Sequence, residues 1–237
     1  MKKKNQPAPA TQGIETPAKI GTRDIFLFGR LENEITLPVI KKLIKLNKLD
    51  AQQPINLYIN SAGGNGYNAD AIIAVMHSLQ ATVNTICLGH ALSGACEILA
   101  SGTGTRSAYE FSTLMFHQTL WEADGDITNL EIQAAQGKRF RDAQIELLHR
   151  CTGQEKSVVK KDIERDHYMS AKEALEYGII DNVLTHERLK NQSDESSVNG
   201  ALSRKKSIAK AAHLGSQKSG PKSTRKTPGR PKTGKGR

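Results

Sequence analysis

The sequence has few cysteines and no long apolar run, and each absence excludes a class of protein. The cysteines are three, an odd number without Cys-x-x-Cys spacing, and they lie in apolar or helical surroundings at Cys87, Cys96 and Cys151. We therefore expect reduced thiols rather than disulfides or a metal site. No segment is apolar over enough residues to span a bilayer, and no apolar core follows the basic start MKKK as in a signal peptide. The sequence predicts a soluble, cytoplasmic protein that makes no use of a membrane.

The positive charge is concentrated in the last part of the chain. From residue 186 onward there are 14 Lys/Arg and 3 Asp/Glu, which leaves 34 − 14 = 20 basic and 24 − 3 = 21 acidic residues before it. The pI of about 9.5 therefore reflects this tail and not the nearly neutral body. Both ends are poor in large apolar residues. We predict a disordered N-terminal extension (1–23), one folded domain (24–185) and a basic disordered C-terminal tail (186–237).

The tail contains TPGRPK at 227–232, which resembles the core of an AT-hook without its usual first arginine. In that motif an arginine flanked by glycine and proline fits a narrow A·T minor groove. One interpretation is therefore a weak contact with DNA or RNA that falls steeply with salt. The alternative is a solvated tail without a partner.

Strand and helix patterns alternate along the body. Apolar and alternating segments predict strands at Asp24–Gly29, Ile55–Asn60, Ala81–Leu88 and Thr113–His117. Helical patterns fall at Glu34–Leu46, around Ile72–Leu79, and at Ser93–Ser101, Ile127–Arg150 and Glu155–Arg165, with a last helix starting at Ser170. The alternation predicts an α/β fold whose parallel strands carry functional loops at their ends.

Two of the predicted helices carry terminal signals. Thr128 and Glu131 have the spacing of a capping box at the start of the long helix. Ser170 and Glu173 have the same spacing at the start of the last helix, and Gly178 supplies its stop.

Residues 89–102 read GHALSGACEILASG, in which Ser93 is set among small and apolar residues. One interpretation is structural: small residues let two backbones pack closely, and the hydroxyl bonds to a nearby carbonyl. The other is chemical: the hydroxyl is a nucleophile at a strand-to-helix turn. The serine alone does not decide between them.

Three further features favour the chemical interpretation. The loop Ser61–Gly64 directly follows the strand INLYIN, and its paired glycines present bare N–H groups that suit an oxyanion hole. His117 ends the segment TLMFH, where a strand end holds an imidazole against a hydroxyl. Asp166, between two predicted helices, suits the orientation of that imidazole. Each feature also has an ordinary alternative, namely a turn, a core histidine and a helix cap.

In their order and intervals these segments resemble the proteolytic subunit of the Clp protease, the ClpP family, over about Asp24–Thr185. YINSAGG is similar to the family's YINSPGG, and GHALSGACEILASG to its GxxASMGA segment. LMFHQ is similar to MIHQP, and ERDHYMSAKEALEYGIID to ERDxxMSAxEAxEYGxID. Several motifs in one order are more specific than any single motif.

The resemblance implies a serine endopeptidase. Residue by residue, it makes Ser93 the nucleophile, His117 the general base and then acid, and Asp166 the group that orients the histidine. The backbone N–H groups of Gly64 and Gly94 match the oxyanion-hole positions. No metal ion takes part in this chemistry.

The resemblance also implies the ClpP/crotonase-like α/β fold of repeated β-β-α units, with a protruding strand-helix handle around 127–150. Members assemble as heptameric rings stacked into a tetradecamer, in some cases with a ClpP paralogue. They hydrolyse unfolded proteins that an AAA+ Clp ATPase supplies. Because Gly-x-x-x-x-Gly-Lys-Ser/Thr occurs nowhere in this chain, we expect it to hold no cofactor and only the partner to use ATP.

The sequence departs from the family pattern in several places. SAGG replaces SPGG, HQT replaces HQP, and LSGAC replaces ASMGA, which moves the glycine next to Ser93. ETPAKIGTR stands where members carry a segment resembling YDIYSRLL, associated with ATPase docking. These changes leave open a noncatalytic ring subunit that partners an active paralogue. A crotonase-type acyl-CoA enzyme would not need the serine, histidine and aspartate, and an α/β-hydrolase would need Gly-x-Ser-x-Gly.

Overall fold

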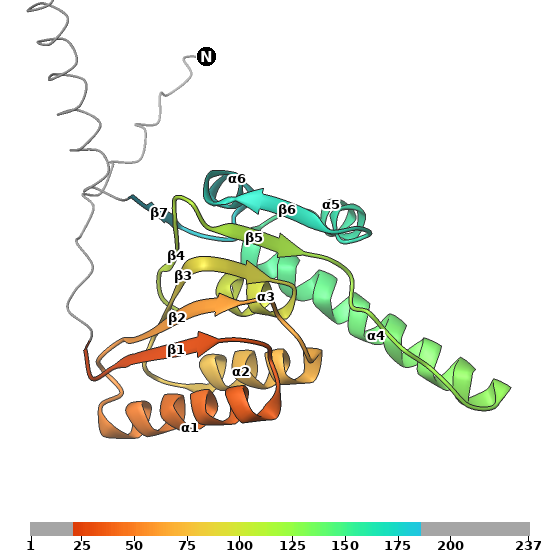
Figure 1. Cartoon of the computed structure of the whole chain (residues 1–237), viewed down its shortest axis with the longest axis horizontal. Coiled ribbons are helices and arrows are strands. Elements are labelled where there is room, and N and C mark those ends of the chain that lie inside the picture. The colour runs from red at the N-terminus through yellow and green to blue at the C-terminus, as the bar shows by residue number, and fades with distance from the viewer. Residues whose placement is uncertain (1–20, 186–237) are drawn as a thin grey trace, which may run out of the picture. The chain divides into compact units, whose positions relative to one another are not determined.

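The structure is a computed structural model that describes residues 21–185 (Figure 1). The predicted disordered ends and the AT-hook-like segment lie outside the described residues, apart from 21–23. The described residues form seven strands, β1 (Asp24–Phe28), β2 (Ile55–Ser61), β3 (Val83–Leu92), β4 (Arg106–Tyr109), β5 (Thr113–Phe116), β6 (His167–Ser170) and β7 (Asn182–Leu184). They also form six helices, α1 (Asn33–Leu49), α2 (Gly66–Ser78), α3 (Gly94–Ala100), α4 (Ile127–Thr152), α5 (Lys156–Asp162) and α6 (Ala171–Tyr177).

The strands make one mixed sheet that is mostly parallel. Its main path is β1-β2-β3-β4-β7, with every pair parallel. Strand β3 changes neighbours along its length: Thr85–Cys87 pairs with β4, whereas His90–Leu92 pairs with β5. Strand β6 then pairs with β5 in the antiparallel direction. The predicted α/β class is confirmed, and the far end of β3 pairs with β5, which in turn pairs with β6.

The helices pack against the sheet or against one another. In α1 the buried residues Thr36, Val39, Leu43 and Leu46 recur every three or four positions, which is the spacing of one helix face. α1 packs on α2 and β1, and α2 in turn packs on α3. α3 is buried along its whole length. Within residues 21–185, none of the helices combines the length and the apolar character that crossing a bilayer requires.

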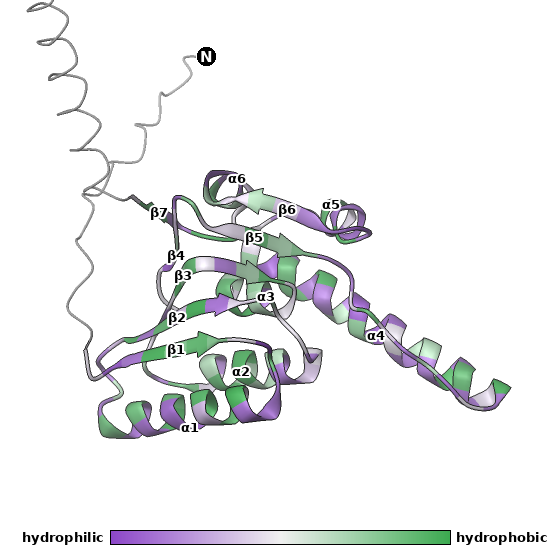
Figure 2. Cartoon of the chain, in the orientation of Figure 1, coloured by the Kyte–Doolittle hydropathy of each residue, from purple (hydrophilic) through white to green (hydrophobic). Residues whose placement is uncertain are grey.

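Helix α4 protrudes from the rest of the described residues (Figure 1). Its buried residues, Gln144, Ile145 and Leu148, all lie in its second half. The outer half carries apolar side chains among hydrophilic ones (Figure 2), and Ile127 and Ile132 are 77% and 61% exposed. Of the predicted strand-helix handle, the helix is therefore present, with an apolar surface that the described residues leave uncovered. The strand before it, β5, lies in the sheet, where it pairs with β3 and β6.

The two predicted capping boxes have different outcomes. The box at Ser170 and Glu173 is confirmed with both of its hydrogen bonds, and Gly178 ends the helix in the left-handed conformation. The box at Thr128 and Glu131 is wrong. α4 is capped one residue before its first turn by Asp126, whose carboxylate accepts from the Asn129 N–H. Aspartate satisfies the same unpaired amides as threonine does, so the motif alone did not fix the first residue of the helix.

Sequence patterns missed three short strands and part of a fourth. β4, β6 and β7 have three or four residues each, too few for alternation to stand out. β3 continues beyond the predicted end at Leu88 to Leu92. This extension matters for the site because it leads directly into Ser93.

Candidate active site

Ser93 sits at the turn from β3 to α3 in a strained backbone conformation. Its φ is 54° and ψ −131°, and it is the one non-glycine residue with positive φ in the part of the chain that the structure describes. The Ser93 N–H donates to the carbonyl of Met115 on β5 at 2.8 Å, and its own carbonyl accepts from Cys96 N at 2.8 Å. Such strain persists only where surrounding contacts fix the backbone. The hydroxyl is therefore held rigidly at the edge of a buried helix.

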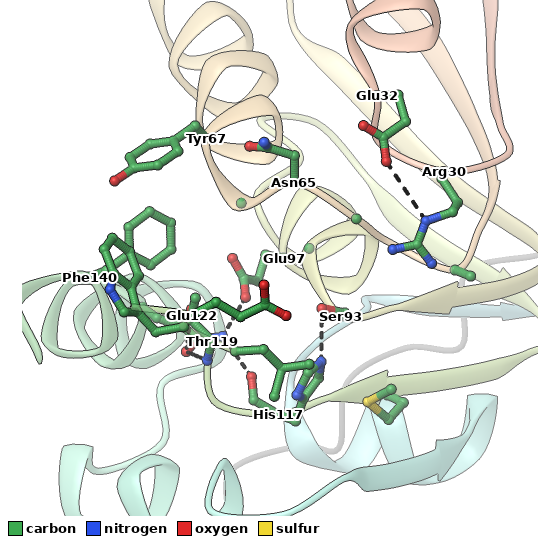
Figure 3. Close-up of a pocket in the computed structure, with 18 residues that line it drawn as sticks. Arg30, Glu32, Asn65, Tyr67, Ser93, Glu97, His117, Thr119, Glu122 and Phe140 are labelled. Carbon is green, nitrogen blue, oxygen red and sulfur yellow. Dashed lines mark hydrogen bonds and ion pairs between the residues drawn. The ribbon is translucent and has the colours of Figure 1, made fainter. Parts of the chain in front are cut away.

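His117 follows β5 and faces Ser93. β5 lies parallel to the end of β3, with Leu92 paired to Met115, so the residues just beyond these strands come together. The Nε2 atom of His117 lies 3.0 Å from Oγ of Ser93, within hydrogen-bonding distance (Figure 3). Behind it, the side chain of Gln144 on α4 donates to the His117 carbonyl at 2.9 Å. The structure thus brings together two residues that are 24 positions apart in the sequence.

Asp166 lies on the other side of His117 but makes a looser contact. The antiparallel pairing of Phe116 with His167 places the residues next to them, His117 and Asp166, opposite each other. Oδ1 of Asp166 is 3.9 Å from Nδ1 of His117, too long for a hydrogen bond. The Asp166 side chain is 59% exposed, against 15% for His117. The carboxylate is near enough to attract a protonated imidazole and does not clamp it.

Gly64 and Gly94 border the same cleft as Ser93. A Cβ at Gly64 would lie 2.7 Å from the Leu31 backbone nitrogen, and one at Gly94 would lie 3.0 Å from Cβ of Ala69. Gly64 also has φ of +151°, which side chains rarely tolerate. Neither N–H donates a hydrogen bond to another residue within 21–185. Close packing and backbone conformation therefore require glycine at Gly64.

The cleft around Ser93 has a volume of about 620 Å³. One wall is aromatic: Phe140 on α4 packs edge-on against Tyr67 on α2, with ring centroids 5.3 Å apart, and lies beside Trp121. Charged residues also line the cleft, namely Arg30, Glu32, Glu97 and Glu122. A cleft of this size and mixed lining suits a segment of polypeptide.

Two functional candidates in the cleft, Glu97 and Gln144, escaped the sequence analysis. Glu97 is only 6% exposed, and its Oε1 accepts from the side-chain amide of Gln144 at 2.5 Å. Burial raises the pKa of Glu97 to about 7, although the hydrogen bond from Gln144 opposes that rise. The signal in the sequence was a single acidic residue inside the apolar segment GACEILA.

The three cysteines are free. Cys87 and Cys96 are buried, and burial raises the pKa of both thiols, that of Cys87 to about 11. Burial also raises the pKa of Cys151. Thiols with raised pKa values are weak nucleophiles at neutral pH. Residues 21–185 contain no group of three or more His, Cys, Asp or Glu side chains arranged to hold a metal ion.

Comparison with known proteins gives the family. Residues 16–187 match the family described as Clp protease. The ATP-dependent Clp protease proteolytic subunit 2 of Mycobacterium leprae is 37% identical over 174 residues, which cover 72% of this chain and 81% of the relative. The protein of the same name from Mycobacterium bovis matches with the same identity and coverage. The chain therefore belongs to the Clp protease family, as a proteolytic-subunit homologue.

Proposed function

We propose that this chain is a serine endopeptidase with Ser93 as nucleophile, His117 as general base and Asp166 as the orienting group. The distance of 3.0 Å between Ser93 Oγ and His117 Nε2, inside a cleft that accommodates a peptide, is the observation that carries the proposal. A serine hydroxyl is a poor nucleophile near neutral pH until a base takes its proton. An imidazole at hydrogen-bonding distance supplies that base.

The chemistry follows from these positions. Ser93 Oγ attacks the substrate carbonyl carbon while its proton passes to His117 Nε2, and the carbonyl oxygen becomes an oxyanion that the N–H groups of Gly64 and Gly94 stabilise. His117 then gives the proton to the leaving amine as the C–N bond breaks, which leaves an ester on Ser93. A water molecule then attacks the ester carbonyl while His117 takes its proton. His117 returns that proton to Ser93 Oγ as the ester C–O bond breaks, which releases the acid product and restores the enzyme. Asp166 favours the protonated imidazole in both steps.

We also propose that the chain works as a ring subunit of a cytoplasmic, ATP-dependent protease. The subunits would form heptameric rings stacked in pairs, and a separate AAA+ unfoldase would use ATP to supply unfolded polypeptides. Two observations support this: the relatives are named as proteolytic subunits of an ATP-dependent Clp protease, and the outer half of α4 exposes apolar residues such as Ile127 and Ile132. Exposed apolar surface of this kind marks interfaces between proteins.

A second candidate function is a noncatalytic ring subunit that supports an active paralogue. It is favoured by Asp166, which is 3.9 Å from the imidazole and more than half exposed. A weakly held histidine would activate Ser93 poorly. The subunit would then contribute surface to the chamber and no bond cleavage.

Hydrolysis of a short fluorogenic peptide distinguishes the two functions, because such a peptide needs no unfoldase. We expect hydrolysis by the full chain, and a loss of at least roughly 1000-fold in kcat/KM in Ser93→Ala. Ser78→Ala is the matched control, since Ser78 is an exposed serine at the end of α2, hydrogen-bonded to the Val75 carbonyl. Equal rates for Ser93→Ala and wild type would refute the nucleophile. Rings without hydrolysis would favour the noncatalytic subunit.

A further inference from the structure

Glu97 lies one helical turn beyond the candidate nucleophile. Its N–H donates to the Ser93 carbonyl at 3.3 Å, so the two residues share one face of α3. Both line the same cleft. In the view of Figure 3, Glu97 lies between Ser93 and the aromatic side chains of Tyr67 and Phe140. Its carboxylate is therefore part of the space next to the reacting hydroxyl.

The Glu97 carboxylate is buried, and only one of its two oxygens accepts a hydrogen bond from a described residue. The residue is 6% exposed, and one oxygen accepts from Gln144. No residue within 21–185 donates a hydrogen bond to the other oxygen, Oε2. Three side-chain atoms in this range, Trp121 Nε1, Arg141 Nε and Thr185 Oγ1, are fully buried without a partner, and Oε2 is not one of them. Oε2 thus keeps some accessible surface, and Glu97 lines both this cleft and a neighbouring cavity of about 220 Å³. A buried carboxylate of this kind is costly unless a donor or a cation completes it.

The described part of the cleft offers no cation for this carboxylate. Arg30, its one arginine, pairs with Glu32 at 3.8 Å, and both side chains are more than half exposed. The carboxylate of Asp70 on α2 adds repulsion, which together with burial raises the pKa of Glu97. Glu122 at the cleft adds a further, exposed negative charge. Among the described residues of the cleft, the Glu97 carboxylate therefore has a hydrogen bond from Gln144 and no cationic partner.

The walls of the cleft suit a long cationic side chain. Tyr67, Trp121 and Phe140 form its aromatic side. Lysine and arginine lay their aliphatic stems along apolar surface, and arginine also stacks on aromatic faces. A guanidinium or ammonium group that passes these rings can donate to a carboxylate at the end of the pocket.

We propose that Glu97 makes this cleft select substrates with arginine or lysine as the residue whose carbonyl Ser93 attacks. The choice of the peptide bond that is cut rests on the proposed peptidase function. The preference for binding a basic side chain needs only the cleft. The substrate carbonyl oxygen lies at the Gly64 and Gly94 amides. The arginine or lysine side chain enters the pocket, and its cationic group donates a hydrogen bond to Oε2 of Glu97. The substrate class is then unfolded polypeptide cut after basic residues.

A pair of peptides that differ in one residue tests the selection. One carries arginine at its centre and the other citrulline, which has the same shape without the charge. Binding is measured by fluorescence anisotropy with full-length Ser93→Ala protein at pH 8, and cleavage sites are mapped with wild type. A charged hydrogen bond contributes enough that we expect roughly 10-fold tighter binding of the arginine peptide.

Substitutions in the cleft assign the effect to one carboxylate. In the Ser93→Ala background, Glu97→Gln keeps the shape and should lower the arginine-to-citrulline ratio of affinities to below about 2. Glu97→Asp keeps the charge and should retain part of the ratio. Glu176→Gln is the matched control, because Glu176 is an exposed glutamate on α6 that does not line the cleft, and it should leave the ratio nearly unchanged.

The outcomes separate this inference from the proposed function. Equal binding of the two peptides by Ser93→Ala protein, or an equal ratio in the Glu97→Gln variant, overturns the inference even if wild type cleaves peptides. A Glu97-dependent preference for arginine without cleavage by wild type supports the inference and refutes the peptidase. Because the peptide pair is first compared without any change at Glu97, misfolding of a variant does not remove the test.

Discussion

In the candidate site, Ser93 and His117 are held more rigidly than Asp166. Ser93 and His117 lie at the ends of paired strands, are joined at 3.0 Å and are anchored by backbone hydrogen bonds. Asp166 lies on the exposed segment between α5 and β6, 3.9 Å from the imidazole. The serine and the histidine are thus placed by the core of the sheet, whereas the aspartate is placed by one short antiparallel pair.

This difference indicates where the catalytic effect should be concentrated. Exposed charges are screened by water and contribute little, while buried and rigid groups keep their geometry through the reaction. We therefore expect Ser93 and His117 to carry most of the rate enhancement. Each of the following predictions contrasts a firmly held residue with a loosely held counterpart.

The largest contrast is expected between His117 and Asp166. His117→Ala removes the base and should lower kcat/KM for a peptide by roughly 10⁴-fold or more. Asp166→Asn should lower it by only about 10- to 100-fold, because the carboxylate is exposed and makes no hydrogen bond to the imidazole. Steady-state kinetics on both variants measure the difference. Equal losses of kcat/KM in the two variants would mean that Asp166 contributes as much to catalysis as His117 does.

The loop beside Ser93 offers a contrast between two glycines of similar conformation. Gly63 and Gly153 have φ of +80° and +76°, but a Cβ at Gly63 would lie 2.5 Å from the Leu92 carbonyl oxygen, while Gly153 has open space. Gly63→Ala should displace the Ser93 turn and lower kcat/KM by roughly 100-fold or more.

Gly153→Ala carries the same backbone strain without the collision. It should cost only about 1 kcal/mol of unfolding free energy and leave peptide hydrolysis nearly intact. Thermal melts and kinetics on both variants provide the test. A normal rate in Gly63→Ala would show that the turn at Ser93 tolerates displacement.

The buried carboxylate of Glu97 predicts a pH-dependent stability. Its pKa rises from 4.5 to about 7 in the folded protein, so the folded state binds a proton that the unfolded chain loses between these values. The corresponding stability is fully present below about pH 4.5 and is lost as the pH rises through about 7. Asp70 on α2, Cys96 on α3 and Cys151 on α4 are titratable neighbours.

Glu97→Gln removes this titration. Between pH 5 and pH 8, wild type should lose up to roughly 3 kcal/mol more unfolding free energy than the variant. Denaturant titrations at the two pH values measure the loss. The exposed carboxylate Glu122 provides the comparison, and Glu122→Gln should follow wild type. The same slope in Glu97→Gln and wild type would contradict a buried, protonated carboxyl.

The smallest contrast concerns the caps of two helices. Ser170→Ala removes the hydroxyl that accepts from the Glu173 N–H and donates to the Glu173 carboxylate at the start of α6. This helix packs on the sheet, and the loss should cost about 1 kcal/mol. Asp126→Ala uncaps α4 at its exposed end, where the first turns bury no side chain, and should lower the global unfolding free energy by less. Chemical denaturation ranks the two. A greater loss in Asp126→Ala would show that the protruding helix is part of the cooperative unit.

The sequence predicted those features that depend on local pattern or on several motifs in order. The helix and strand alternation, the capping box at Ser170 and the place of Ser93 at a strand-to-helix turn all follow from neighbouring residues. The proximity of Ser93 and His117 was inferred from motif order. The structure accounts for it by the parallel pairing of β3 with β5.

Other features depend on contacts that no local pattern shows. β4 is a strand because it pairs with β3 and β7, and β7 because it pairs with β4, in a sheet that joins distant segments. Glu97 became a candidate only when its burial and its contact with Gln144, 47 residues away, were visible. The loose position of Asp166 likewise depends on the register of β5 and β6 and on solvent exposure.

The most direct test of the central claim is covalent labelling by a fluorophosphonate, which reacts with a serine only when a base activates it. The labelled protein is digested and the modified residue is mapped by mass spectrometry, with Ser93→Ala and His117→Ala as controls. We predict one modified serine, Ser93, with labelling abolished in Ser93→Ala and strongly slowed in His117→Ala. Absence of label on Ser93 in assembled wild-type protein, or labelling at an unchanged rate in His117→Ala, would contradict activation of this hydroxyl by His117.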